Sequence, residues 1–140
     1  MLCVDVNVLV NAFRQDAKNH EASRDWLDSA QRGDDLVLLL PEVIASAMRI
    51  LTNARIWVNP STIDDVLASI DDLYVSSSLV IHEPGPRRWD IFQSLLREHR
   101  LQAGDVQDGL LAAAALELDA TFVTSDRDFS RFRELRLVHP

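Results

Sequence analysis

Residues 2–13 read LCVDVNVLVNAF, and this stretch decides the fold. An apolar run from Leu2 ends at Asp5, which is typical of a short strand buried on both faces of a parallel sheet. From Asn7 onward the residues suit the first turns of a helix. The sequence therefore predicts a strand that passes directly into a helix, with a carboxylate at the junction.

The same alternation of strand and helix continues along the chain. Further apolar runs predict strands at 36–40, 79–81, 121–124 and 135–138, and helical periodicity predicts helices at 20–32, 41–51, 62–74, 87–99 and 105–118, with a helical turn at 128–132. This alternation indicates an α/β fold with a mostly parallel central sheet covered by helices on both faces. No internal repeat or interdomain linker interrupts it, so we expect one domain over residues 1–140.

Composition excludes several classes of protein. With 47% hydrophobic residues the chain can bury a sizeable core, and a lone cysteine, Cys3, excludes a disulfide framework. No stretch approaches the roughly 20 apolar residues of a membrane span. The apolar N-terminus lacks basic residues and is interrupted by Asp5 and Asn7, so it does not resemble a signal peptide. We expect a soluble, cytoplasmic protein.

The formal net charge of −8 argues against nucleic-acid binding through a simple basic surface. Carboxylates grouped around a divalent cation, however, become a neutral or positive site once the metal is bound. Lys18 is the only lysine, and arginine is the side chain suited to bidentate phosphate recognition. Two groups of arginines are candidates for such contacts, although either could be a solvated face or a protein contact: Arg87, Arg88, Arg97 and Arg100, and Arg127, Arg131, Arg133 and Arg136.

Three aspartates are expected at one edge of the sheet. Asp5 ends the first strand and Asp126 follows the strand at 121–124, while Asp108 opens the helix that leads into that strand. Because this helix runs antiparallel to its strand, its first turn lies at the carboxyl ends of the strands, where α/β sheets bind ligands. Carboxylates suit Mg²⁺ or Mn²⁺, and such ions can activate a water for phosphodiester hydrolysis.

Helix capping is an alternative explanation for each of these acids. Asp5 or Asn7 suits the N-cap of the first helix, Asp105 and Asp108 have the spacing of an N-cap and N3 pair, and Asp126 or Asp128 suits the cap of the short helical turn. Three unpaired carboxylates at one edge would repel each other unless a cation joined them. Their convergence therefore favours a metal site, although each acid taken singly fits a cap.

Several motifs resemble those of a known family. Residues 4–9, VDVNVL, resemble the opening motif of PIN-domain proteins, and DGLLAAAALE at 108–117 with FVTSDRDF at 122–129 resembles their closing pair. The similarity spans the chain and is closest to the VapC-type toxins of toxin–antitoxin pairs, where MRILTN at 48–53 and FRELRL at 132–137 resemble a group abundant in mycobacteria.

The resemblance implies a PIN-like three-layer α/β/α sandwich with Mg²⁺-dependent endoribonuclease activity, in which a metal-activated water cuts RNA. It also implies a homodimer and a small DNA-binding antitoxin of the VapB type as inhibitor. Carried over by position, the acids are Asp5, Asp108 and Asp126, with Asp128 a nearby substitute, and the polar residues that orient them are Asn7, Thr124 and Ser125.

The family's second acid has no direct match. Family members usually carry a glutamate about three residues before an arginine in the helix after the second strand, but Arg49 here follows Ser46, Ala47 and Met48. Glu42, one turn earlier, either substitutes for that acid or only stabilises the helix dipole. Without it, three acids hold the metal and the affinity is weaker.

Two other functions stay open at this point. Asp5 and Asn7 after a first strand resemble the nucleophile motif of haloacid-dehalogenase-like phosphatases, although those enzymes usually carry a second aspartate at the Asn7 position and a longer chain. A catalytically weak or inactive PIN-like module that only binds its antitoxin would also fit the missing acid. The sequence does not identify an RNA target, since this depends on loops such as 56–61 and 83–86.

Overall fold

The computed structural model describes residues 1–75 and 78–140. Its strands are β1 (Leu2–Val4), β2 (Val37–Leu39), β3 (Leu79–Ile81), β4 (Thr121–Val123) and β5 (Leu137–Val138). Its helices are α1 (Val6–Phe13), α2 (His20–Arg32), α3 (Pro41–Leu51), α4 (Ile63–Tyr74), α5 (Arg87–Glu98), α6 (Asp105–Glu117) and a 3₁₀ helix, η1 (Arg127–Arg131). The predicted elements are all present, and the largest differences in extent are in β2 and β5, each of which is two residues shorter than predicted.

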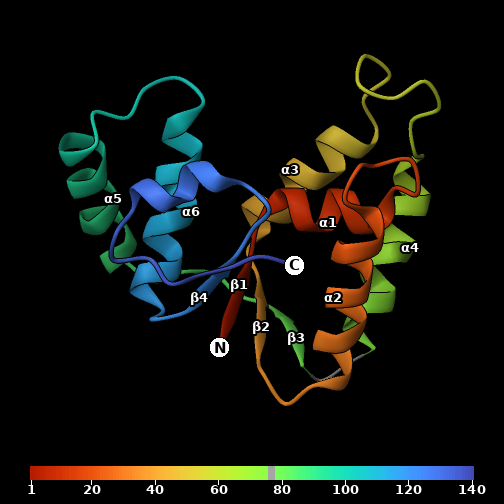
Figure 1. Ribbon diagram of the computed structural model, residues 1–140, viewed down its shortest axis with the longest axis horizontal. Coiled ribbons are helices and arrows are strands. Elements are labelled where there is room, and N and C mark those ends of the chain that lie inside the picture. The colour runs from red at the N-terminus through yellow and green to blue at the C-terminus, as the bar shows by residue number, and fades with distance from the viewer. Residues whose placement is uncertain (76–77) are drawn as a thin grey trace.

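The five strands form one sheet in the order β3-β2-β1-β4-β5, and every neighbouring pair is parallel. The central strand, β1, pairs through Cys3 with Leu38 of β2 and Phe122 of β4. Figure 1 shows α5 and α6 on one side of the sheet and α1, α2 and α4 on the other. The predicted α/β/α sandwich is therefore confirmed. The three central strands, β2, β1 and β4, are largely buried on both sides, as their uninterrupted apolar sequences require, whereas the edge strands β3 and β5 end in exposed residues, Ile81 and Val138.

Small residues let α6 approach the rest of the protein closely. Its residues Ala112, Ala113, Ala114 and Ala115 are fully buried. A Cβ added at Gly109 would lie 2.5 Å from Cδ1 of Leu101, so this position has no room for a larger side chain unless Leu101 moves. Gly109 directly follows Asp108, and the close packing there fixes where the first turn of α6 presents that carboxylate.

Three chain segments meet at the carboxyl ends of β1 and β4. Asp5 links β1 to α1, residues 124–126 link β4 to η1, and the first turn of α6 lies beside them. This is the edge at which the sequence predicted the acidic residues. Within residues 1–75 and 78–140, no helix is both long and apolar enough to cross a membrane.

Candidate active site

Asp5 is held by neutral donors in the interior of the protein. Its side chain is only 5% exposed. Oδ1 accepts a hydrogen bond from the backbone N–H of Val6 at 2.7 Å, and Oδ2 accepts from Asn7 Nδ2 and Thr124 Oγ1, both at 2.5 Å. Asp5 thus caps α1, as one prediction had it, and both of its oxygens are fixed in place by the surrounding donors.

Asn7, Thr124 and Ser125 extend this arrangement into what we call the inner network, with Asp5 at its centre. Asn7 Nδ2 also donates to Thr124 Oγ1 at 3.0 Å, and Asn7 Oδ1 accepts from the Ser125 N–H at 3.0 Å. Thr124 Oγ1 in turn accepts from the Asp126 N–H at 2.9 Å. The three polar residues predicted to orient the acids therefore join the β1–α1 junction to the loop after β4.

Asp126 begins η1. Its Oδ1 accepts from the Asp128 N–H at 2.9 Å, so Asp126 is the N-cap of η1, as the capping explanation predicted. The corresponding prediction for α6 is wrong, because its N-cap is Gly104, with no side-chain cap, and Asp105 is the first helical residue. The carboxylates of Asp105 and Asp108 are therefore not used as caps.

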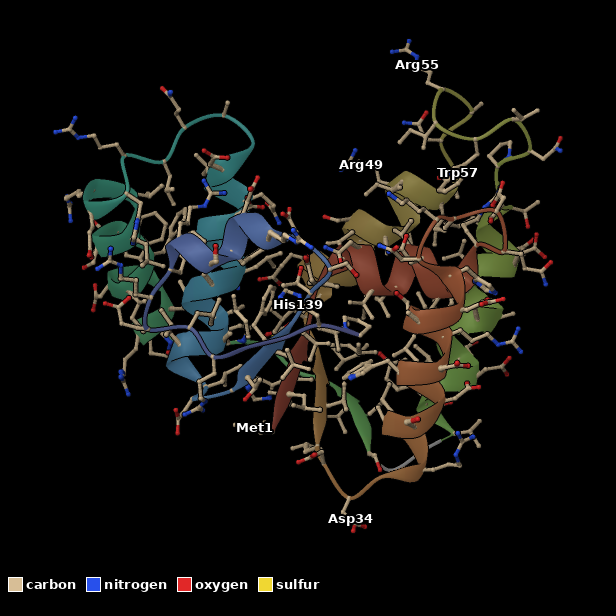
Figure 2. All side chains as sticks on the ribbon, viewed as in Figure 1. Met1, Asp34, Arg49, Arg55, Trp57 and His139 are labelled. Atoms are coloured by element: carbon tan, nitrogen blue, oxygen red, sulfur yellow. The ribbon has the colours of Figure 1, made fainter. Side chains whose placement is uncertain are left out.

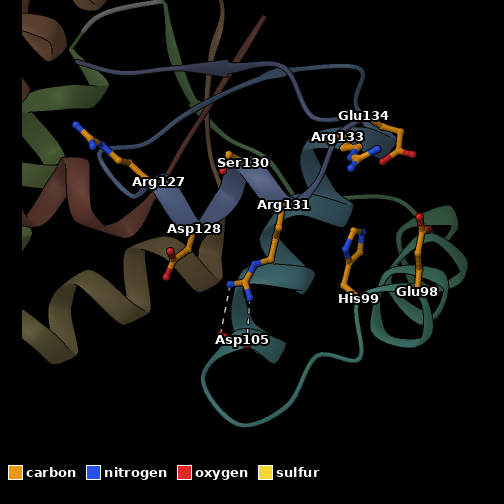
Figure 3. A pocket seen from close by; sticks show the side chains of 9 residues that line it. All are labelled: Glu98, His99, Asp105, Arg127, Asp128, Ser130, Arg131, Arg133 and Glu134. Atoms are coloured by element: carbon orange, nitrogen blue, oxygen red, sulfur yellow. Dashed lines mark hydrogen bonds and ion pairs between the residues drawn. The ribbon is translucent and has the colours of Figure 1, made fainter.

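Arg131 of η1 binds both of these α6 carboxylates. Its guanidinium lies 2.7 Å from Asp108 Oδ2 and 3.0 Å from Asp105 Oδ2, and the side chain is 26% exposed. We call this set of three residues the arginine bridge, and Figure 3 shows Arg131 reaching from η1 to Asp105 at the start of α6. The bridge neutralises part of the acidic charge on the solvent side of the site.

Glu42 stands at the start of α3, directly after β2, and forms an ion pair with Arg88 of α5. Burial raises the pKa of the Cys3 thiol to about 12, and the charges of Glu42 and Asp5 add to this shift. Glu42 thus stands at the carboxyl end of β2, at the same edge of the sheet as Asp5, but it is not among the residues that line the cavity described next.

Asp5, Asp108 and Asp126 share one cavity of about 430 Å³. It is lined by Asp5, Val6, Asn7, Val10, Asn11, Ser46, Arg49, Ile50, Gly104, Gln107, Asp108, Leu111, Asp126 and Phe129. Arg49 is exposed at its mouth (Figure 2) and forms no ion pair within the described part of the chain. A neighbouring groove of about 810 Å³ runs along η1 and contains Asp128, so this predicted substitute acid faces a different hollow.

The three aspartates act on each other electrostatically. Burial raises the pKa of Asp5 from 3.8 to about 6, with smaller contributions from the charges of Asp108 and Asp126, while its hydrogen bonds oppose the shift. Burial also raises the pKa of Asp108, the Arg131 charge lowers it, and Asp126 raises it again. The cavity is thus a place where negative charge is crowded and a cation is favoured.

The donor set fits Mg²⁺ or Mn²⁺, because these ions prefer carboxylate oxygens. The carboxylates are not, however, gathered around one point: among the residues that the structure describes, no three His, Cys, Asp or Glu side chains form a group that could hold an ion. The structure brings the three predicted acids to one cavity and leaves Asp108 bound to Arg131. Their side chains would have to move for the three acids to share an ion.

Sequence reasoning missed the arginine bridge. Arg131 belongs to a group of four arginines expected to contact phosphate, solvent or a protein partner, whereas it binds two acids of its own chain, and Arg136 of the same group binds Asp119. The available signal was the spacing of Asp105 and Asp108, which puts both carboxylates on one face of the first helical turn. It did not identify which of the arginines would reach them.

Comparison with known proteins agrees with this architecture. A family model described as the PIN domain matches residues 2–135. The VapC ribonuclease Mb2897 of Mycobacterium bovis is 39% identical over all of this chain and 95% of its own length. Ribonuclease VapC25 of Mycobacterium tuberculosis is 34% identical over the whole chain and 99% of its own length.

Solved structures with the same fold are more distant in sequence. A VapBC2 complex from Rickettsia felis, bound to a DNA fragment from its promoter, has a TM-score of 0.72 at 18% identity, covering 99% of this chain and 97% of that one. VapC20 of Mycobacterium tuberculosis, a toxin that cleaves the sarcin-ricin loop, has a TM-score of 0.69 at 14% identity, covering 94% and 95%. With a family model over nearly its full length and relatives above 30% identity, the chain belongs to the PIN-domain family and to its VapC-type branch.

Proposed function

We propose that this protein is a metal-dependent endoribonuclease that acts in the cytoplasm as the toxin of a type II toxin–antitoxin pair. The observation that carries the proposal is the cavity in which Asp5, Asp108 and Asp126 come together from three separate segments. The charge of Asp126 contributes to raising the pKa of both Asp5 and Asp108. The names of the mycobacterial relatives, which are ribonucleases, support the same reaction for this chain.

Each acidic residue has a distinct part in the proposed site. Asp5 and Asp108 are the principal metal ligands, and Asp126 completes the ligand set or orients it. A bound Mg²⁺ or Mn²⁺ would supply an activated water and neutralise charge that develops on the phosphate. Thr124 and Asn7 keep the Asp5 carboxylate fixed through their hydrogen bonds, so that it does not rotate out of the cavity.

Glu42 is proposed as the fourth acid. It follows β2 at the same edge of the sheet as Asp5 and is held by Arg88, much as Asp108 is held by Arg131. Its carboxylate would orient a water or help to bind a second ion, a role that requires release from Arg88. Asp128 faces the groove beside η1 and caps nothing, so we retain it only as a secondary candidate.

Arg49 is proposed to bind a phosphate of the RNA. It is the only basic residue among those that line the cavity, and it has no acidic partner in the described residues. A guanidinium at the mouth of an acidic pocket would counteract the repulsion between the pocket and a polyanionic substrate. The cavity lining contains no histidine, so the cleavage is not assigned to a pair of histidines.

A VapB-type antitoxin and a second copy of the chain are the proposed partners. Among the structural neighbours are complexes described as VapBC2 from Rickettsia felis and VapBC-1 from nontypeable Haemophilus influenzae. An antitoxin segment with basic side chains would be attracted to the acidic cavity by electrostatic complementarity.

RNA cleavage by the purified protein in Mg²⁺ tests the activity. We expect products with 5′-phosphate and 3′-hydroxyl ends, and we expect Asp5→Asn and Asp108→Asn each to reduce the rate by about 10³-fold or more. Glu42→Gln is expected to reduce it by about 10–100-fold. Asp34→Asn is the matched control, because this exposed aspartate lies at the opposite end of the molecule (Figure 2) and should retain the full rate.

Cleavage that persists in both aspartate variants would contradict the proposal. A second candidate, a module that binds its antitoxin without catalysis, is favoured by the absence of a gathered ligand group in the described residues. That function predicts antitoxin binding by the wild-type protein without Mg²⁺-dependent cleavage of any RNA, including the total RNA of the host.

A further inference from the structure

Arg131 is a cation that already pairs with one acid of the proposed site. Its two terminal nitrogens bind Asp105 and Asp108, while its Nε is buried and donates to no acceptor in the described residues. The guanidinium also lies 5.3 Å from the centre of the Phe132 ring, which restricts its position. Two carboxylates and an aromatic ring thus hold one arginine against the first turn of α6.

The bridge joins the groove beside η1 to the cavity of the proposed site. Arg131 and Asp105 line the groove, whereas Asp108, one helical turn after Asp105, lines the cavity and is held by Arg131 through Oδ2. Asp5, in contrast, is held by Thr124 and Asn7 on the β1–β4 side. The bridge therefore occupies one of the two carboxylates that the proposed function requires to bind one ion.

We propose that Arg131 is a built-in competitor of the metal: it binds Asp108 in the metal-free protein and has to release it when a divalent ion binds. This inference rests on the proposed function, since it concerns the same cavity. A carboxylate oxygen that accepts a charged N–H at 2.7 Å is not available to an ion, and a guanidinium beside a divalent cation is repelled. On release, Arg131 remains bound to Asp105, which supplies an anchor outside the cavity.

The neighbouring arginines of the same segment provide a contrast. Arg127 and Arg133 also line the groove beside η1, but neither forms an ion pair within residues 1–75 and 78–140. Figure 3 shows Arg133 beside Glu134, well away from Asp105. A substitution at Arg133 removes the same charge as one at Arg131 without breaking the bridge, which makes it the matched control.

Calorimetric titration of the folded, metal-free chain with MnCl₂ tests the proposal without any measure of activity. We expect Arg131→Gln to bind Mn²⁺ about tenfold more tightly than the wild type, since one charged hydrogen bond no longer has to be broken. Arg133→Gln should stay within about twofold of the wild type, because it reports only the long-range effect of removing a positive charge.

Thermal unfolding supplies a second readout. A ligand that binds only the folded state raises the melting temperature, and tighter binding gives a larger rise at the same ligand concentration. Mn²⁺ should therefore raise the melting temperature of Arg131→Gln by more than that of the wild type. Should the glutamine variant fail to fold, Arg131→Lys decides the question, since a lysine can hold one carboxylate but not bridge two. It should bind Mn²⁺ more tightly than the wild type and less tightly than Arg131→Gln.

Unchanged affinity for Mn²⁺ in the Arg131 variants overturns the proposal. Weaker affinity also overturns it, and would indicate that Arg131 positions Asp108 for the ion. If neither wild type nor variant binds Mn²⁺, the proposal also fails. The proposed function is judged separately, by Mg²⁺-dependent RNA cleavage and its loss in Asp5→Asn. If the wild type cuts RNA but Arg131→Gln binds Mn²⁺ no more tightly than the wild type, the proposed ribonuclease function stands. Only the proposal that Arg131 competes with the metal then fails.

Discussion

Asp5 and Asp108 line the same cavity, but neutral donors hold the first deep inside the protein, whereas a charged arginine holds the second near the surface. The inner network fixes the position of the Asp5 carboxylate without neutralising its charge. The arginine bridge neutralises Asp108 and in doing so occupies it. The Asp5 carboxylate thus has no cationic partner in the described residues, whereas Asp108 is already paired with Arg131.

This difference indicates how the two sides respond to a change of charge. At Asp5, on the inner side, binding a proton or a metal ion reduces the unfavourable free energy of burying a charged carboxylate. The free energy of unfolding should therefore depend strongly on whether a proton or an ion is bound there. At Asp108, on the outer side, Arg131 already compensates the negative charge, so binding a proton or an ion there should change the free energy of unfolding little. Changes on the inner side are therefore expected to have larger effects than changes on the outer side.

The largest expected effect is the dependence of stability on pH. Because burial raises the pKa of Asp5 to about 6, above its value of 3.8 in an unfolded chain, the folded state holds this proton more tightly. The stability that this proton contributes is complete below about pH 4 and is lost as pH rises through 6. For the metal-free wild type, this residue should lower the free energy of unfolding by about 2–3 kcal/mol between pH 4 and 7.

Urea unfolding of the wild type and Asp5→Asn in EDTA, at several pH values from 4 to 7.5, measures this contribution. Asparagine cannot ionise and is itself a good N-cap, so the variant should show a flatter dependence on pH. A constant difference between the two proteins across the whole range would show that Asp5 is not the group responsible.

Next in size is the loss of the Thr124 hydroxyl. Thr124→Val removes the donor to Asp5 and the acceptor for both Asn7 and the Asp126 N–H, all in a fully buried position. We expect a loss of about 1–3 kcal/mol in unfolding free energy and a further fall of about 10–100-fold in cleavage. Thr121→Val on the same strand is the control, since its hydroxyl has no side-chain hydrogen bond in the described residues and should cost little.

Most of the fold and the inner side of the site were predictable from the sequence. The uninterrupted apolar strands can only be buried on both faces, and the alternation with helices then requires parallel pairing. The position of Asp5 at the end of β1, and of Thr124 and Ser125 after β4, follows from that topology alone. Backbone connectivity determines where these residues lie, and no long side chain is involved.

The outer side was not predictable in the same way. Arg131 and Arg88 are long side chains with several rotatable bonds, and the acid that each one reaches depends on the packing of η1 and α5 against the sheet. Sequence spacing places Asp105 and Asp108 on one face of α6 but says nothing of a partner more than twenty residues away. The resemblance to a family identified the acids as metal ligands and could not show that the chain's own arginine binds one of them.

The smallest expected effect comes from the outer end of the arginine bridge. Asp105→Asn removes one anchor of Arg131 and an acidic residue from the first turn of α6, while Arg131 keeps its contact with Asp108. The Asp105 side chain is 48% exposed, so solvent screens the pair. We expect a loss of less than about 1 kcal/mol, measured by urea unfolding in EDTA at pH 7.5. If Asp105→Asn destabilises the protein as much as Thr124→Val does, the arginine bridge contributes as much to stability as the inner network. Arg131 would then be held too firmly for a metal ion to replace it at Asp108.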